Sequence, residues 1–128
     1  MPTNEDAMTL ADLIERLEKA SGPDREIDAS IAGETGWTHM DAWVLSDSYW
    51  IAPNDEKHEA VPTYTASLDA ALTLLTERQY LFELRQLNAD RWYAEIGDIA
   101  DDKTDGDCYG KTGPLALVTA ALKARAAL

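Results

Sequence analysis

The residues best suited to chemistry in this 128-residue chain are aromatic and basic side chains on the second of two predicted hairpins. Tyr93 is expected on the solvent-exposed face of that hairpin, with Arg85 and Arg91 close to it. A flat ring beside guanidinium groups can bind a base by stacking and a phosphate by charged hydrogen bonds. Tyr49 and Trp50, in the first predicted hairpin, complete the candidate ligand-binding set. The alternative interpretation is that the rings fill the core and the arginines are solvated.

The sequence contains no catalytic or metal-binding motif that withstands a check of its spacing. Gly106 and Gly110, before Lys111 and Thr112, are one residue too close together for a phosphate-binding P-loop. The two histidines are isolated from each other and lie outside any zinc-binding pattern. The single Cys108 cannot form an internal disulfide. The sequence therefore predicts a protein that is not an enzyme, with no catalytic residues, no metal and no cofactor.

The charge of the chain is strongly negative and unevenly distributed. The net charge is -13, and all 24 acids lie at or before Asp107, so residues 1–107 carry -16 and the remainder carries +3. Such a field repels phosphate backbones, which disfavours direct nucleic-acid binding and favours basic partners. The absence of an apolar run of roughly 18 residues predicts no membrane segment. With one cysteine and no signal-peptide pattern, the chain is expected in the host cell cytoplasm.

The hydrophobic pattern predicts helices separated by hairpins. Helices are expected over 10–20, 24–33, 63–77 and 113–128, hairpins over 42–52 and 80–98, and loops over 53–62 and 98–113. Asp24 is the expected N-cap of the second helix. Phe82 and Trp92 are expected on the core face of the second hairpin. The predicted fold class is α+β, with an antiparallel sheet from the two hairpins layered between helices. Residues 1–128 form one expected domain, of which residues 1–9 are a flexible N-terminus.

Four segments also resemble a known family when they are taken in order. They are DREIDASIAGETGW, PTYTASLDAALTLL, WYAEI and GPLALVTAALKARAAL. In this order and at these separations they resemble the phage ABA sandwich domain family of phage and prophage genomes. The chain departs from the family pattern at Gly113, where threonine is commoner, and at Val118, where cysteine is commoner. The resemblance implies a helix-sheet-helix sandwich and a phage-linked origin, and it implies no catalytic residues.

Two functions follow as hypotheses. The first is a phage or prophage accessory protein for counter-defence, which binds and sequesters a small nucleotide-like immune signal of the host without turning it over. The alternative is an acidic mimic of nucleic acid that inhibits a basic host defence protein. The sequence leaves homo-oligomer formation open.

Overall fold

The computed structural model describes residues 9–40, 48–99 and 103–126. Its elements in chain order are α1 (Leu10–Lys19), α2 (Arg25–Glu34), β1 (Thr38–Met40), β2 (Tyr49–Ile51), β3 (Lys57–His58), α3 (Leu68–Leu72), β4 (Gln79–Asn88), β5 (Arg91–Asp98), β6 (Lys103–Gly110) and α4 (Gly113–Ala126). None of the helices in the described ranges has the length and apolarity needed to cross a bilayer.

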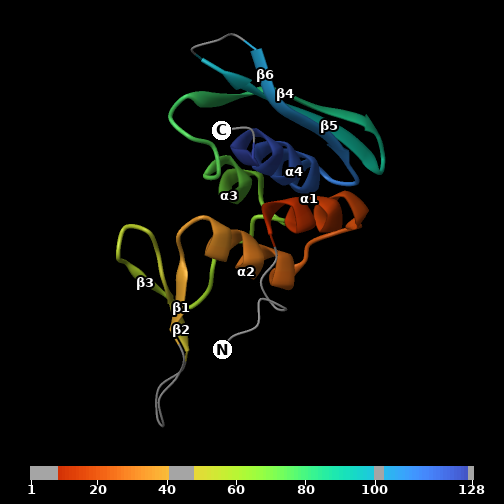
Figure 1. The fold of residues 1–128 in the computed structure, drawn as a ribbon. Coiled ribbons are helices and arrows are strands. Elements are labelled where there is room, and N and C mark those ends of the chain that lie inside the picture. The colour runs from red at the N-terminus through yellow and green to blue at the C-terminus, as the bar shows by residue number, and fades with distance from the viewer. Residues whose placement is uncertain (1–8, 41–47, 100–102, 127–128) are drawn as a thin grey trace.

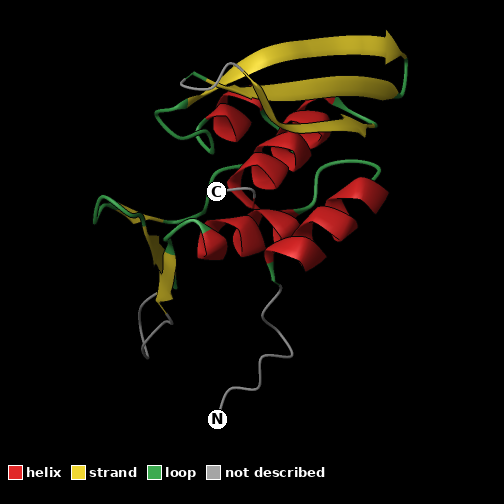
Figure 2. Cartoon of the chain, turned by 45° about the horizontal axis from the view of Figure 1, so that its top comes forward, coloured by secondary structure: helices red, strands yellow, loops and turns green. Residues whose placement is uncertain are grey.

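Helices and antiparallel strands form layers, as predicted. Strands β1, β2 and β3 form one three-stranded sheet, sheet A, and strands β4, β5 and β6 form another, sheet B. Sheet B covers α4, while α1 and α2 lie on the opposite side of α4 (Figure 1). Sheet A projects beside the C-terminal end of α2, away from sheet B (Figure 2). The predicted α+β class is therefore confirmed, with the strands in two separate three-stranded sheets.

Helix α4 is the centre of the core because nearly all of its side chains are buried. Its alanines allow an unusually close contact with β6. A Cβ atom added at Gly106 would lie 2.5 Å from the carbonyl oxygen of Ala120. One added at Gly110 would lie 2.6 Å from the backbone nitrogen of Ala116. The backbones of helix and strand therefore touch, which only glycine permits at these two positions.

The first two helices begin as their sequences predict. Thr9 and Asp12 form a capping box at the start of α1, so Thr9 has a defined position. Residues 1–8, the rest of the N-terminus that was expected to be flexible, lie outside the described residues. The Asp24 carboxylate accepts hydrogen bonds from the backbone N–H groups of Glu26 and Ile27 at the start of α2. The capping interpretation of Asp24 is confirmed.

The end of α2 fixes the direction in which the chain enters sheet A. Gly36 has a φ of +99°, in the region that favours glycine. The next residue, Trp37, donates its backbone N–H to the carbonyl of Ala32 over 2.9 Å. This helix-terminating turn sets the position of the Trp37 side chain.

Several predicted elements differ from those observed. The predicted loop 98–113 contains β6, which pairs with β5 along most of its length, and the predicted loop 53–62 contains the short strand β3. The helix predicted over 63–77 is shorter, since α3 begins after the cap Ser67. In sheet A the strand that pairs with β2 is β1, and the predicted strand 42–46 lies outside the described residues.

Phe82 does not lie in the core, contrary to the prediction. Its side chain is 60% exposed, because a register shift between Leu81 and Glu83 inserts one extra residue into β4. Leu81 and Leu84, three residues apart, therefore both pack against the core. Trp92 is half-buried against the core, as predicted.

Candidate functional site

The outer face of sheet B collects the residues predicted for the second hairpin. The strand register places Arg85 opposite Tyr93 and Tyr93 opposite Tyr109. The rings of Tyr93 and Tyr109 lie 5.1 Å apart, and the Arg91 guanidinium lies 4.5 Å from the centre of the Tyr109 ring. Three of the five predicted site residues thus share one face. Tyr109 was missed because it belongs to a segment predicted as a loop.

The polar groups on this face already bind one another. Arg85 pairs with Glu83 at 3.5 Å. The Tyr93 hydroxyl donates to Glu95 at 2.9 Å and is 3.4 Å from Asp107. Burial raises the pKa of the Tyr93 phenol, and the hydrogen bond and negative charge of Glu95 add to that increase, as does Asp107. The phenol therefore remains a hydrogen-bond donor to the two carboxylates.

The same face carries a row of acids that crosses all three strands of sheet B. Glu83 is opposite Glu95, and Glu95 is opposite Asp107. Neighbouring strands lie about 4.8 Å apart, so the three carboxylates are close neighbours. An anion that approached Arg85 or Tyr93 would meet this acidic row, which makes the face a poor site for phosphate.

Tyr49 and Trp50 lie on β2 in sheet A, on the far side of the helices from sheet B (Figure 1). The ammonium group of Lys57 lies 4.5 Å from the centre of the Tyr49 ring, and the rings of His39 and Trp50 are 4.7 Å apart. The structure thus divides the five predicted site residues between two separate surfaces.

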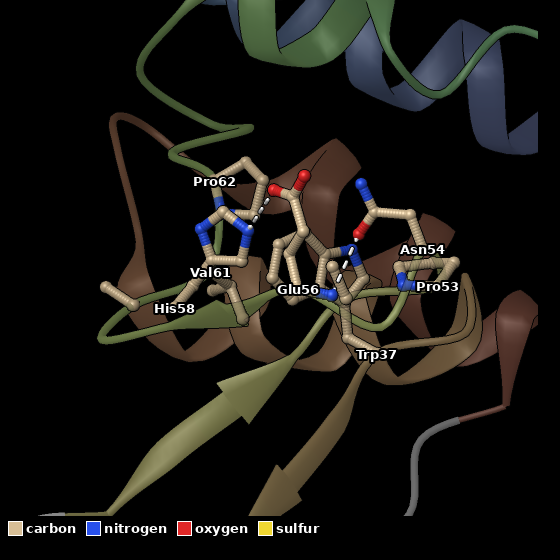
Figure 3. A pocket seen from close by; sticks show the side chains of 9 residues that line it. Trp37, Pro53, Asn54, Glu56, His58, Val61 and Pro62 are labelled. Carbon is tan, nitrogen blue, oxygen red and sulfur yellow. Dashed lines mark hydrogen bonds and ion pairs between the residues drawn. The ribbon is translucent and has the colours of Figure 1, made fainter.

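A cavity with a volume of about 470 Å³ lies beside sheet A (Figure 3). The Trp37 and His58 rings lie on its wall with their centres 5.1 Å apart. His58 Nε2 is 3.6 Å from a carboxylate oxygen of Glu56, and Asn54 accepts a hydrogen bond from the Glu56 backbone over 3.2 Å. His58 on β3 lies opposite Trp50 on β2 in the sheet register. The cavity thus combines aromatic walls with a few polar groups, as ligand sites commonly do.

A smaller cavity of about 260 Å³ adjoins the first. Trp37, Pro53 and Pro62 line both cavities, so these side chains form a wall that the two cavities share. The rest of the smaller wall is formed by Thr35, Tyr64, Thr73, Leu74 and Arg125. It includes a cation and no carboxylate.

Arg125 is the distinctive group of the smaller cavity. Its Nη2 donates to the Leu74 carbonyl over 3.1 Å, while its buried Nε has no hydrogen-bond partner. No carboxylate in the described part of the chain pairs with it. By contrast, four other arginines each pair with an acid: Arg16, Arg25, Arg78 and Arg85. In a chain with a charge of -13, Arg125 thus lies in a cavity wall with no acid partner among the described residues, and a guanidinium is a group that can pair with an anion.

The phenol of Tyr64 lies in the same wall. Burial raises its pKa and the charge of Asp28 adds to this, whereas hydrogen bonding from Thr35 and Trp37 and the charge of Arg125 act in the opposite direction. The phenol is therefore a neutral group that can donate a hydrogen bond beside the guanidinium.

Sequence reasoning missed this site for identifiable reasons. In the sequence, Arg125 is a basic residue near the C-terminal end of the last predicted helix, where basic side chains commonly serve only the helix dipole. Trp37 is one of several aromatic residues near the first predicted hairpin, and nothing in its sequence context distinguishes it from the others. The usable signal was that Arg125 belongs to the short, acid-free end of the chain, where a local ion-pair partner is less available.

Comparison with known proteins adds no relative. No family model, curated protein or solved structure gives a significant match to the chain. The resemblance to the phage ABA sandwich family therefore stays a prediction. Across the described ranges, no group of three or more potential ligand side chains is arranged to hold a metal ion.

Proposed function

We propose that the protein is a non-enzymatic binding protein that sequesters a small nucleotide-like anion in the two adjoining cavities. The observation that carries the proposal is the Arg125 guanidinium, which lies in a cavity wall and has no carboxylate partner among the described residues. The family resemblance supports a phage or prophage accessory role in counter-defence, acting in the host cytoplasm on an immune signal.

The chemistry of the lining supports binding of this class of ligand. A phosphate oxygen can accept hydrogen bonds from the guanidinium, and charged hydrogen bonds contribute about 1.5–3 kcal/mol each. A base stacked on an aromatic ring contributes about 1–3 kcal/mol. Trp37 offers such a ring in the wall that the two cavities share.

A thermal-shift screen tests the proposal directly. The probes are adenosine monophosphate, guanosine monophosphate, ADP-ribose and cyclic diguanylate, each with the full chain. A ligand present at about 100 times its dissociation constant stabilises the folded state by about 2.7 kcal/mol, which should raise the melting temperature by roughly 10 °C. Arg125→Met, which keeps the aliphatic length without the charge, should remove most of that shift.

Arg91→Met is the matched control, because Arg91 also has no carboxylate partner in the described ranges but lies on sheet B. It should leave the ligand-induced shift unchanged. If Arg91→Met and Tyr93→Ala abolish the shift and Arg125→Met does not, the ligand binds the hairpin face and the cavity assignment is wrong. A flat response to all four probes would contradict the proposed function itself.

The acidic row of sheet B favours a second candidate function, inhibition of a basic nucleic-acid-binding protein. The row places one negative charge on each strand, at Glu83, Glu95 and Asp107, with the strand spacing of about 4.8 Å between them. This spacing is comparable to the spacing of phosphates along a nucleic-acid strand. The net charge of -13 would steer a basic partner toward the chain.

This candidate predicts competition with DNA. The protein should displace a labelled duplex from a basic DNA-binding protein at about 50 mM salt and much less well at about 200 mM salt. The variant Glu95→Gln with Asp107→Asn should displace severalfold less, whereas Asp69→Asn with Glu77→Gln, two exposed positions outside sheet B, is the charge-matched control. Equal displacement by both variants would show that the row has no special role.

A further inference from the structure

The relative sizes of the two cavities restrict the kind of nucleotide that fits. Ligand sites usually have volumes of roughly 300–1,000 Å³. The larger cavity, at about 470 Å³, falls within that range, and the smaller one, at about 260 Å³, falls below it. The larger cavity can therefore take a base with its sugar, while the smaller one has room for a single compact group.

The charges of the two cavities also differ. The smaller cavity contains the Arg125 guanidinium, which suits one phosphate. The larger cavity contains Glu56, and the nearest cationic candidate there, His58, is already 3.6 Å from that carboxylate. A phosphate in the larger cavity would face Glu56, whose charge would repel it. The lining therefore provides for one phosphate rather than two.

Glu56 can instead recognise a base. A carboxylate oxygen accepts hydrogen bonds from N–H groups and donates none when ionised. The side chain of Glu56 is 66% exposed at the rim of the cavity, within reach of a base that lies against Trp37 and His58. Guanine presents two adjacent N–H donors on one edge, which matches the two oxygens of a carboxylate.

From these differences we infer that the ligand is a nucleoside monophosphate, bound with its phosphate at Arg125 and with a base that donates N–H groups to Glu56. This inference rests on the proposed function, since it names the ligand class for the same two cavities. It excludes cyclic dinucleotides, which would place a second phosphate beside Glu56.

Isothermal titration with five probes tests the inference on the full chain. The probes are guanosine monophosphate, adenosine monophosphate, guanosine, inorganic phosphate and cyclic diguanylate. Guanosine monophosphate should bind at least tenfold more tightly than guanosine, because guanosine lacks the phosphate, and at least tenfold more tightly than cyclic diguanylate. It should also bind more tightly than adenosine monophosphate, because adenine presents one amino group and no ring N–H beside it.

Two variants test which residue binds the base of the ligand and which binds its phosphate. Glu56→Gln should weaken guanosine monophosphate about tenfold and leave the affinity for inorganic phosphate unchanged, since the carboxylate meets only the base. Arg125→Met should bring guanosine monophosphate down to the affinity of guanosine. Glu56 is largely exposed, so the melting temperature of the free Glu56→Gln variant should match that of the unmodified chain.

The outcomes separate the inference from the proposed function. Cyclic diguanylate that binds as tightly as guanosine monophosphate, with a dependence on Arg125, would overturn the inference and leave the proposed function standing. Equal affinity for guanosine and guanosine monophosphate would also overturn it, because the phosphate would then make no contact. Failure of all nucleotide probes to bind would overturn both.

Discussion

Replacing Asp28 with alanine should lower the free energy of unfolding by about 3 kcal/mol. The Asp28 side chain is buried in α2 and accepts hydrogen bonds from Arg25 at 2.8 Å and from both the backbone N–H and the hydroxyl of Thr65 at 2.8 and 2.9 Å. Alanine would leave the buried N–H of Thr65 without an acceptor, while the Thr65 hydroxyl would keep only its longer contact to the Asp24 carbonyl at 3.3 Å, and these two changes account for most of the loss. The Arg25 side chain is half-exposed and would regain water, so its contribution is smaller.

Chemical denaturation followed by circular dichroism measures this change. Asp28→Asn is expected to lose about half as much stability, because its amide oxygen still accepts from Thr65. Glu34→Ala, at an exposed position on the same helix, is the control and should change stability by less than about 0.5 kcal/mol. An Asp28→Ala protein as stable as the Glu34→Ala control would show that the buried carboxylate contributes nothing net.

The Asp28 cluster also supports the candidate site. Arg25, held by Asp28, donates to the Val61 carbonyl over 3.0 Å, and Val61 and Pro62 line the larger cavity. Thr65 adjoins Tyr64 of the smaller cavity. Loss of Asp28 should therefore weaken ligand binding as well as stability, even though its carboxylate lies outside both linings.

Gly106→Ala should destabilise the fold by about 3 kcal/mol, since overpacking typically costs 1–3 kcal/mol and more where backbone must move. The added Cβ would lie 2.5 Å from the Ala120 carbonyl oxygen and 2.7 Å from the Ala124 backbone nitrogen. Both neighbours are backbone atoms of the buried helix α4, so no flexible side chain can move aside. Relief requires α4 and β6 to separate, which would open the core between them.

Gly33→Ala provides a matched control for the same chemical change. Gly33 is exposed in helix α2, and an added Cβ there meets no atom within 4 Å. Because alanine is the better helix former, this variant should gain about 0.5–1 kcal/mol. Thermal and chemical unfolding of both variants measures the two changes in the free energy of unfolding. Equal and small changes would mean that β6 and α4 adapt to the methyl group without cost.

Local signals in the sequence were sufficient for the helix starts and the second hairpin. Thr9 and Asp24 act through neighbours two or three residues away, so their capping roles can be predicted without knowledge of the fold. The hairpin of β4 and β5 follows from alternation on both sides of a short polar turn. These elements depend on contacts that lie close along the chain.

The missed features depend on contacts between distant segments. Strand β6 has a loop-like composition because its glycines serve the contact with α4, and only pairing with β5 makes the segment a strand. The position of Phe82 depends on a bulge that alternation alone cannot reveal. The candidate cavities join Trp37, a loop near Pro62 and Arg125 on the last helix, residues that the sequence gives no reason to group.

The bulge at Phe82 also affects how copies of the chain can meet. Strand β4 is ten residues long and lies at an edge of sheet B, where β5 is its strand partner among the described residues. A long regular edge invites pairing with a strand of another molecule, which leads to continuous sheets and aggregation. The register shifts at Leu81/Glu83 and Gln86/Asn88 interrupt that edge, so only short stretches remain regular. The irregularity is therefore expected to hinder fibre-like growth through β4 in a concentrated solution of the protein.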